Sequence, residues 1–128
     1  MVNGFSFQKY GVSTEFDARP NIIRNNYFYN CGIDLAGAIG DTQIINNQIT
    51  GGTISLGDTS NILIKGTTIS QSKRGLWMGN EARLPTVTGC TFKNCEYAVY
   101  FTGYGGIPSL DTFYGNKYIS NKHNFGWN

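Results

Sequence analysis

Two segments, NIIRNNYFYN at residues 21–30 and TQIINNQITG at residues 42–51, carry the pattern that decides the fold. In each, an apolar residue is followed two positions later by Asn and three positions after that by a second apolar residue. With Gly also allowed at the middle position, the pattern occurs six times, as VNGFSF from Val2, IRNNYF from Ile23, IINNQI from Ile44, IKGTTI from Ile64, VTGCTF from Val87 and FYGNKY from Phe113. The copies begin 21, 21, 20, 23 and 26 residues apart, a spacing typical of a solenoid.

The third position of every copy is Gly or Asn: Gly4, Asn25, Asn46, Gly66, Gly89 and Gly115. These two residue types best tolerate a positive φ, so we expect a left-handed bend at the same place in each repeat. Both disfavour helices, whereas the Ile, Val, Thr, Phe and Tyr between them favour strands. The next position faces inward, and there we expect Asn26 to lie over Asn47 in a short ladder of buried amides.

A second apolar segment follows each copy, at Val12 and Thr14, Ile33 and Leu35, Ile54 and Leu56, Leu76 and Met78, Val99 and Phe101, and Phe125 and Trp127. Each repeat therefore predicts three short strands separated by turns. Successive coils would pair in parallel about 4.8 Å apart. The sequence predicts an all-β chain, a parallel β-helix of about six coils with three short strands per coil, forming a single domain over residues 1–128.

In these repeats the chain resembles the right-handed parallel β-helices of the pectate lyase-like superfamily, and most of all a phage tailspike-type segment. The resemblance implies a polysaccharide or surface glycan as partner, a homo-oligomer in the form of a trimer, and a place on a virion or extracellular surface. It also implies folding in the cytoplasm without a signal peptide. A leucine-rich repeat would need a Leu consensus that is absent. We further expect the domain to be part of a longer protein or to be capped by partner chains, because neither terminal repeat carries a polar cap.

Composition excludes several classes of partner. Ten Lys and Arg against eight Asp and Glu, without a basic cluster, argue against nucleic-acid binding. The sequence has no apolar run of about 18 residues, so we expect no membrane insertion.

Cys31, Cys90 and Cys95 are predicted to be reduced thiols, although a Cys90–Cys95 disulfide stays open. His123 has no companion ligand, so we expect no metal site and no cofactor.

The third strand of each repeat has an outward column, namely Ser13, Asp34, Ser55, Trp77, Tyr100 and Gly126. Loops of varying length border this face, and we expect a ligand groove beside the longer ones, residues 71–75, 93–98 and 102–112. Sugars stack on aromatic rings and bind charged groups through their hydroxyls, which makes Trp77, Tyr100 and Arg74 candidate ligand-binding residues. Alternatively, Trp77 packs under a loop or against another subunit, and Arg74 is surface charge.

Three carboxylates are candidate catalytic residues: Asp58, Glu81 and Asp34. Asp58 and Glu81 follow the third strands of adjacent repeats, and glycoside hydrolysis needs two carboxyl groups about 5 to 10 Å apart. Such residues are also common in turns. We therefore predict a surface-glycan binding module, and leave open whether it is also a hydrolase or lyase. The alternative is a non-enzymatic scaffold or oligomerisation module.

Overall fold

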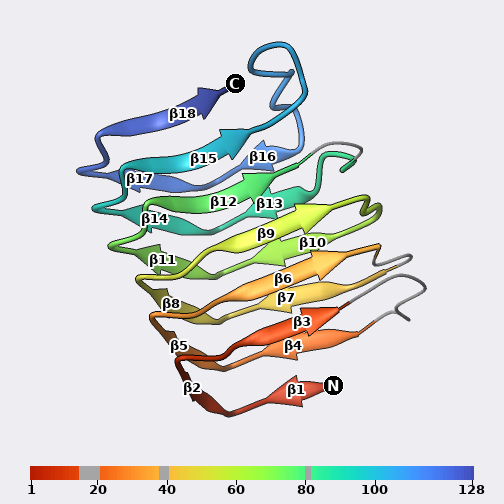
Figure 1. The fold of residues 1–128 in the computed structure, drawn as a ribbon, viewed down its shortest axis with the longest axis vertical. Coiled ribbons are helices and arrows are strands. Elements are labelled where there is room, and N and C mark those ends of the chain that lie inside the picture. Colours follow the sequence, from red (N-terminus) through yellow and green to blue (C-terminus); the bar gives the residue numbers. More distant parts are fainter. Residues whose placement is uncertain (15–20, 38–40, 80–81) are drawn as a thin grey trace.

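The computed structural model describes residues 1–14, 21–37, 41–79 and 82–128, which form three six-stranded parallel sheets and no helix (Figure 1). The first sheet contains β1 (Val2–Asn3), β4 (Ile22–Arg24), β7 (Gln43–Ile45), β10 (Leu63–Lys65), β13 (Thr86–Thr88) and β16 (Phe113–Tyr114). The second contains β2 (Ser6–Gln8), β5 (Tyr27–Tyr29), β8 (Gln48–Thr50), β11 (Thr68–Ser70), β14 (Thr91–Lys93) and β17 (Lys117–Ile119). The third contains β3 (Val12–Thr14), β6 (Ile33–Ala36), β9 (Ile54–Gly57), β12 (Arg74–Met78), β15 (Tyr97–Phe101) and β18 (His123–Trp127).

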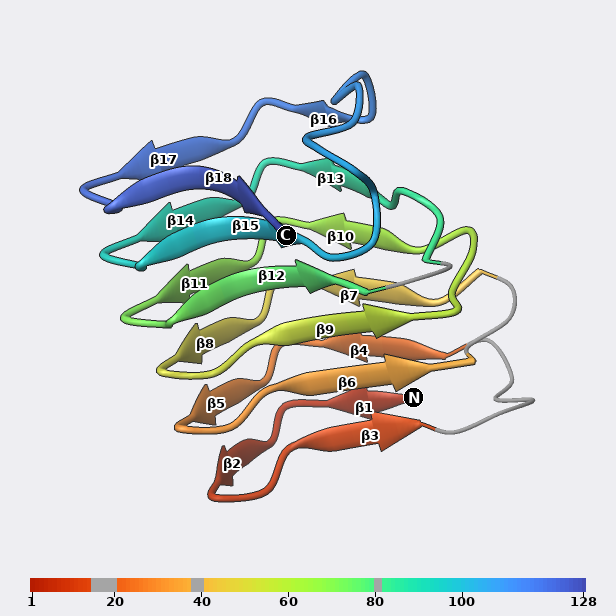
Figure 2. The ribbon, with the colours of Figure 1, turned by 45° about the horizontal axis from the view of Figure 1, so that its top comes forward.

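Each strand pairs in parallel with the strand one repeat away, so the chain winds as a parallel β-helix (Figures 1 and 2). The register aligns equivalent residues of neighbouring repeats: Ile23 pairs with Ile44, and Ile44 pairs with Ile64. The predicted fold class, an all-β parallel solenoid with three strands per coil, is confirmed. Among the described residues, no helix is long and apolar enough to cross a membrane.

The predicted row of left-handed bends is present between the first and second sheets. All six positions have φ between 53° and 77°: Gly4, Asn25, Asn46, Gly66, Gly89 and Gly115. Each bend turns the chain from one sheet into the next without a long loop. In every coil the chain therefore passes from the first sheet into the second through a left-handed bend at the equivalent position.

A second left-handed row, which was not predicted from the sequence, lies between the second and third sheets. Its members are Lys9, Asn30, Gly51, Gln71, Asn94 and Ser120, with φ between 54° and 77°. Only half of these residues are Gly or Asn, so residue type alone does not reveal the row. Backbone pairing on both sides of the bend holds the Lys, Gln and Ser residues in a conformation that such side chains rarely adopt.

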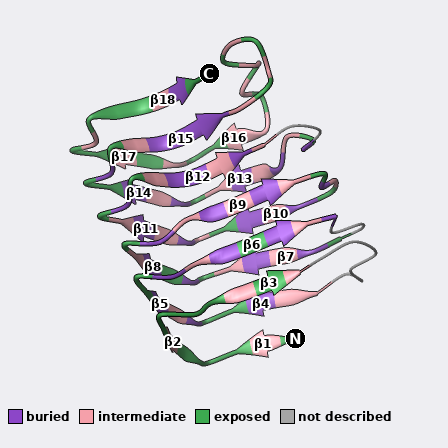
Figure 3. Cartoon of the chain, viewed as in Figure 1, coloured by how far each residue is buried: buried purple, intermediate pink, exposed green. Residues whose placement is uncertain are grey.

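Apolar side chains from the three sheets form the core. Figure 3 shows where the buried residues lie along the strands. Phe28 and Ile49 are fully buried in the second sheet, and Leu35 and Leu56 are buried to the same degree in the third. Apolar residues recur at these positions because alternate side chains of a strand point to opposite faces. The inward faces therefore exclude water, while the outward faces are free to carry other chemistry.

The predicted amide ladder is confirmed at the first row of bends. The Asn47 side-chain oxygen accepts hydrogen bonds from the backbone N–H and side-chain amide of Asn26, at 3.0 and 3.1 Å. The Asn47 amide donates to the Ile23 carbonyl at 2.9 Å. The same bond is made one coil earlier, where the Asn26 amide donates to the Val2 carbonyl. Asn47 is 2% exposed, so these bonds satisfy groups that water does not reach.

Two cysteines take the place of asparagines in such ladders. Cys90 Sγ donates to the Ile64 carbonyl, as the Asn116 amide one coil later donates to the Val87 carbonyl. At the second row of bends, Cys95 Sγ likewise donates to the Ile69 carbonyl. Burial raises the pKa of the Cys90 and Cys95 thiols, which keeps them protonated as donors. All three cysteines of the chain are free, as predicted.

Candidate functional site

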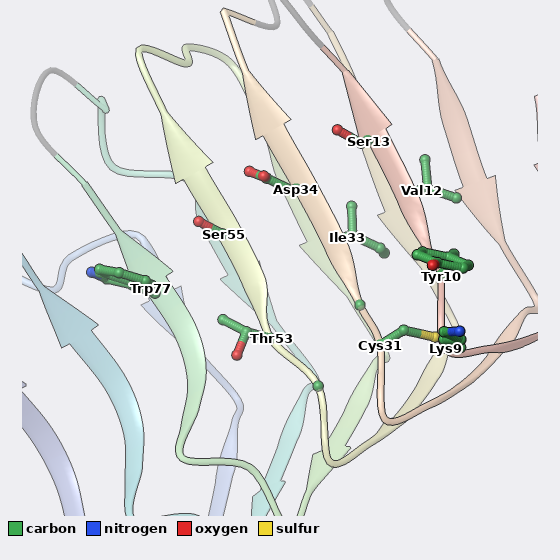
Figure 4. Close-up of a pocket in the computed structure, with 13 residues that line it drawn as sticks. Lys9, Tyr10, Val12, Ser13, Cys31, Ile33, Asp34, Thr53, Ser55 and Trp77 are labelled. Atoms are coloured by element: carbon green, nitrogen blue, oxygen red, sulfur yellow. The ribbon is translucent and has the colours of Figure 1, made fainter.

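A groove with a volume of about 600 Å³ runs across the outer face of the third sheet, from the loop before β3 to β12 (Figure 4). Its floor holds the outward residues Ser13, Asp34 and Ser55 of three successive strands. Lys9 and Tyr10 line one end, and Trp77 lines the other. The groove thus lies along the solenoid axis and spans four coils.

The floor of the groove is recessed because the residues that form it have small side chains or none. Beside the Ser and Asp column the floor is made of Gly11, Gly32 and Gly52, each packed against the backbone of a neighbouring coil. A Cβ atom on Gly32 would lie 2.1 Å from the Thr53 carbonyl oxygen, so no larger residue fits there. The glycines therefore let the coils stack closely and leave the outer surface hollow.

Trp77 closes the groove where the outward column changes from small to large residues. It pairs with Ser55 on one side and with Tyr100 on the other, which confirms the predicted column. The indole is half-buried, and its Nε1 donates to Thr102 Oγ1 at 2.9 Å. This bond fixes the ring orientation, so Trp77 is a rigid wall at the end of the groove.

Aromatic and cationic side chains continue the same face beyond Trp77. The Arg74 guanidinium lies over both the Trp77 and the Tyr100 rings. Tyr100 is buried, packs edge-on against Tyr97 with ring centroids 5.0 Å apart, and does not line the groove. Of the three predicted ligand-binding residues, Trp77 lines the groove, whereas Arg74 and Tyr100 do not. Arg74 stacks on the rings of both Trp77 and Tyr100.

The other end of the groove, at Lys9 and Tyr10, was not predicted from the sequence. Tyr10 is 74% exposed, and the Lys9 ammonium lies 5.3 Å from the centre of its ring. Both residues belong to the turn between β2 and β3, where Lys9 has a φ of 77°. No sequence pattern predicts a left-handed conformation at a lysine, so the sequence did not indicate that Lys9 and Tyr10 face the groove.

Two of the three predicted catalytic carboxylates, Asp34 and Asp58, lie within the described residues, and they differ in their relation to the groove. Asp34 is exposed on the groove floor. Asp58 is exposed in a turn after β9, with a φ of 50°, and is not among the residues that line the groove. Glu81 lies outside the described residues. Within the described chain, Asp34 is therefore the one predicted carboxylate that lines the groove.

The groove lies on the predicted face but mostly over earlier coils. We expected it beside the loops 71–75, 93–98 and 102–112, whereas the first four coils form it, so only the first of these loops precedes a strand that borders it. The 102–112 loop instead packs toward the core through Tyr104 and Leu110, and the Tyr104 hydroxyl donates to the Ala82 carbonyl. A long loop is as able to cover apolar surface as to border a site, and the sequence does not distinguish the two.

Comparison with known proteins identifies one family. The family model described as "Periplasmic copper-binding protein (NosD)" matches residues 2–128, which is almost the entire chain. Neither a curated protein nor a solved structure matches the chain significantly.

Proposed function

The chain belongs to the NosD family, and we propose that it binds an extended saccharide in the groove of the third sheet. The observation that carries the proposal is the groove itself, which combines a column of polar side chains on its floor with an aromatic ring at each end. Sugars present apolar C–H faces and polar hydroxyl groups, and sites that bind them need both kinds of contact. Trp77 and Tyr10 supply aromatic rings for the C–H faces. The hydroxyl groups would bind to Ser13, Asp34 and Ser55.

The dimensions of the groove favour an oligosaccharide over a single sugar. Coils stack about 4.8 Å apart, so the three steps from β3 to β12 span about 14 Å. On the floor, Ser13 and Asp34 are exposed to solvent and Ser55 is half-buried. A linear chain lying along the axis would therefore meet one outward side chain per coil.

Replacing Trp77 by alanine tests the proposal. We expect the affinity for a bound oligosaccharide to fall about tenfold to a hundredfold, because the substitution removes the aromatic wall at one end. A glycan array first identifies a ligand, and calorimetric titration of wild type and variant then measures the change. Tyr29→Ala is the matched control, because Tyr29 is an exposed aromatic residue on the second sheet, away from the groove. Equal affinities of wild type and Trp77→Ala would contradict the proposal.

Copper is the ligand that the family description names, but the described residues do not form a copper site. Copper sites use thiolate, thioether and imidazole ligands gathered at one point. This chain has one His, three Cys and two Met. Cys90 and Cys95 donate to backbone carbonyls, His123 stacks on Tyr97, and Met78 is fully buried. Among the described residues, no three His, Cys, Asp or Glu side chains come together.

The ladder role of Cys90 leads to a second prediction. In Cys90→Asn, the new amide takes the place that Asn116 occupies one coil later, so we expect the free energy of unfolding to stay within about 1 kcal/mol of wild type. Cys90→Leu removes the donor and should cost about 1–3 kcal/mol. Urea denaturation measures both. Titration with Cu(I) against a competing chelator should show no uptake that depends on Cys90; stoichiometric uptake lost in Cys90→Asn would contradict the structural role.

The remaining sequence-based expectations stay predictions. They are the tailspike-like role, the trimer, the virion or extracellular location and glycan cleavage. The alternative scaffold function also stays open, and the Trp77 experiment separates it from saccharide binding. If the chain is a scaffold, neither the wild type nor Trp77→Ala should bind a glycan.

A further inference from the structure

The outer face of the first sheet carries aliphatic side chains that point away from the core. In β4, β7 and β10 the middle residue is buried and its two neighbours face outward. Half of these outward residues are aliphatic and half-buried, namely Ile22, Ile45 and Leu63. The outward residues of the second sheet in the same coils are Tyr27, Tyr29, Gln48, Thr50, Thr68 and Ser70. The aliphatic surface is therefore specific to the first sheet.

Two opposite charges lie on this face at a fixed offset. Lys65 ends β10 two residues after Leu63, and Asp41 precedes β7 two residues before Gln43. Both charged side chains are exposed. Because Leu63 pairs with Gln43, the two charges are four residues apart along the strands, or about 13 Å. That separation is too long for an ion pair within one chain.

Asp41 also lines a hollow at the start of these strands. The hollow has a volume of about 330 Å³, and its lining residues are Met1, Asn21, Ile22, Asp41 and Gln43. They include one carboxylate and no lysine or arginine. The hollow is thus large enough for a long side chain, and its charge favours one that ends in a cation.

We infer that the first sheet is an interface at which a second copy of this chain docks through a two-fold axis. The axis is perpendicular to the sheet and passes between the paired residues Gln43 and Leu63. It lays β7 of one copy over β10 of the other with the strand directions reversed. Residues two positions before Gln43 then meet residues two positions after Leu63, so Lys65 of the second copy enters the hollow at Asp41.

The same symmetry makes the interface self-complementary. Each dimer contains the contact between Asp41 and Lys65 twice, as an isologous interface requires. Leu63 of the second copy lies over Gln43, next to Ile22, which pairs with Gln43 on its other side. The strands of this face are short, so we expect a dissociation constant in the micromolar range, typical of small interfaces. The inference does not depend on the saccharide groove, which lies on the third sheet.

Charge reversal tests the inference, with sedimentation equilibrium of the full chain as the measurement. We expect Asp41→Lys and Lys65→Asp each to raise the monomer–dimer dissociation constant about tenfold at low ionic strength, because each places like charges together at two points. The double variant, Asp41→Lys with Lys65→Asp, restores both contacts in reversed order and should return to within about threefold of wild type. Lys93→Asp, on the outer face of the second sheet, is the control and should leave the constant unchanged.

The double variant separates pairing from a general effect of charge. Failure of the double variant to recover would overturn the inference, as would equal weakening by Lys93→Asp. A chain that is monomeric up to about 1 mM, or that forms a trimer, would overturn it as well. Thermal unfolding of each variant establishes that the compared chains are folded. Glycan binding at the third sheet is measured separately, so failure of the dimer leaves the proposed function standing.

Discussion

Replacing Asn47 by leucine should lower the free energy of unfolding by about 3–5 kcal/mol, because it leaves several buried groups without partners. The Asn26 backbone N–H would lose its acceptor, the Asn26 side-chain amide would keep only the Val2 carbonyl, and the Ile23 carbonyl would lose a donor. None of these groups is compensated by water, since Asn26 and Asn47 are 3% and 2% exposed. Urea denaturation followed by circular dichroism measures the loss.

Asn124→Leu is the matched control for this experiment. Asn124 also accepts a hydrogen bond from a neighbouring amide, that of Asn121, but its side chain is exposed. Water replaces the lost partner there, so the unfolding free energy should change by less than about 0.5 kcal/mol. An equal loss of unfolding free energy in Asn47→Leu and Asn124→Leu would contradict a stabilising role for the buried Asn47 ladder.

Replacing Gly32 by alanine should destabilise the chain by about 3 kcal/mol or more, through a steric clash that cannot relax easily. The added Cβ would lie 2.1 Å from the Thr53 carbonyl oxygen and 2.8 Å from the Thr53 nitrogen. These are backbone atoms of the next coil, held by parallel pairing, so the two coils would have to separate. The same change raises the floor of the groove.

Gly57→Ala provides the comparison, because Gly57 lies in β9 of the same sheet and a methyl group added to it would have no other atom within 4 Å. Its φ is not in the left-handed region, so alanine fits without strain. We expect the free energy of unfolding of Gly57→Ala to stay within about 1 kcal/mol of wild type. Melting temperatures of the two variants measure the difference, and similar values would contradict the close approach at Gly32.

The fold could be predicted from the sequence because its main signals are local and repeated. Six copies of one apolar and Gly or Asn pattern indicate three strands and a bend per coil, and the bends at Asn25, Asn46 and Gly66 lie where expected. The outward column containing Asp34, Ser55 and Trp77 follows from strand alternation, which has a period of two. Each of these inferences needs only the order of residues in the chain.

The groove needed contacts between coils and was predicted only in part. Its face was expected, but its position over the first four coils depends on glycines that pack against the backbone of neighbouring coils. Its Lys9 and Tyr10 end depends on a left-handed lysine, a conformation imposed by the pairing around it. The support of Arg74 by Tyr100 depends on the register between β12 and β15.

By itself, the sequence determined that this chain coils into a parallel β-helix and which side chains face outward, since hydrophobic period and tolerance of positive φ are properties of individual residues. Only the tertiary structure decided which outward side chains share a groove, which of Asp34 and Asp58 lines it, and that Cys90 and Cys95 serve as internal donors. The physical reason is that these properties arise from distances between residues about 20 or more positions apart, and stacking of the coils sets those distances.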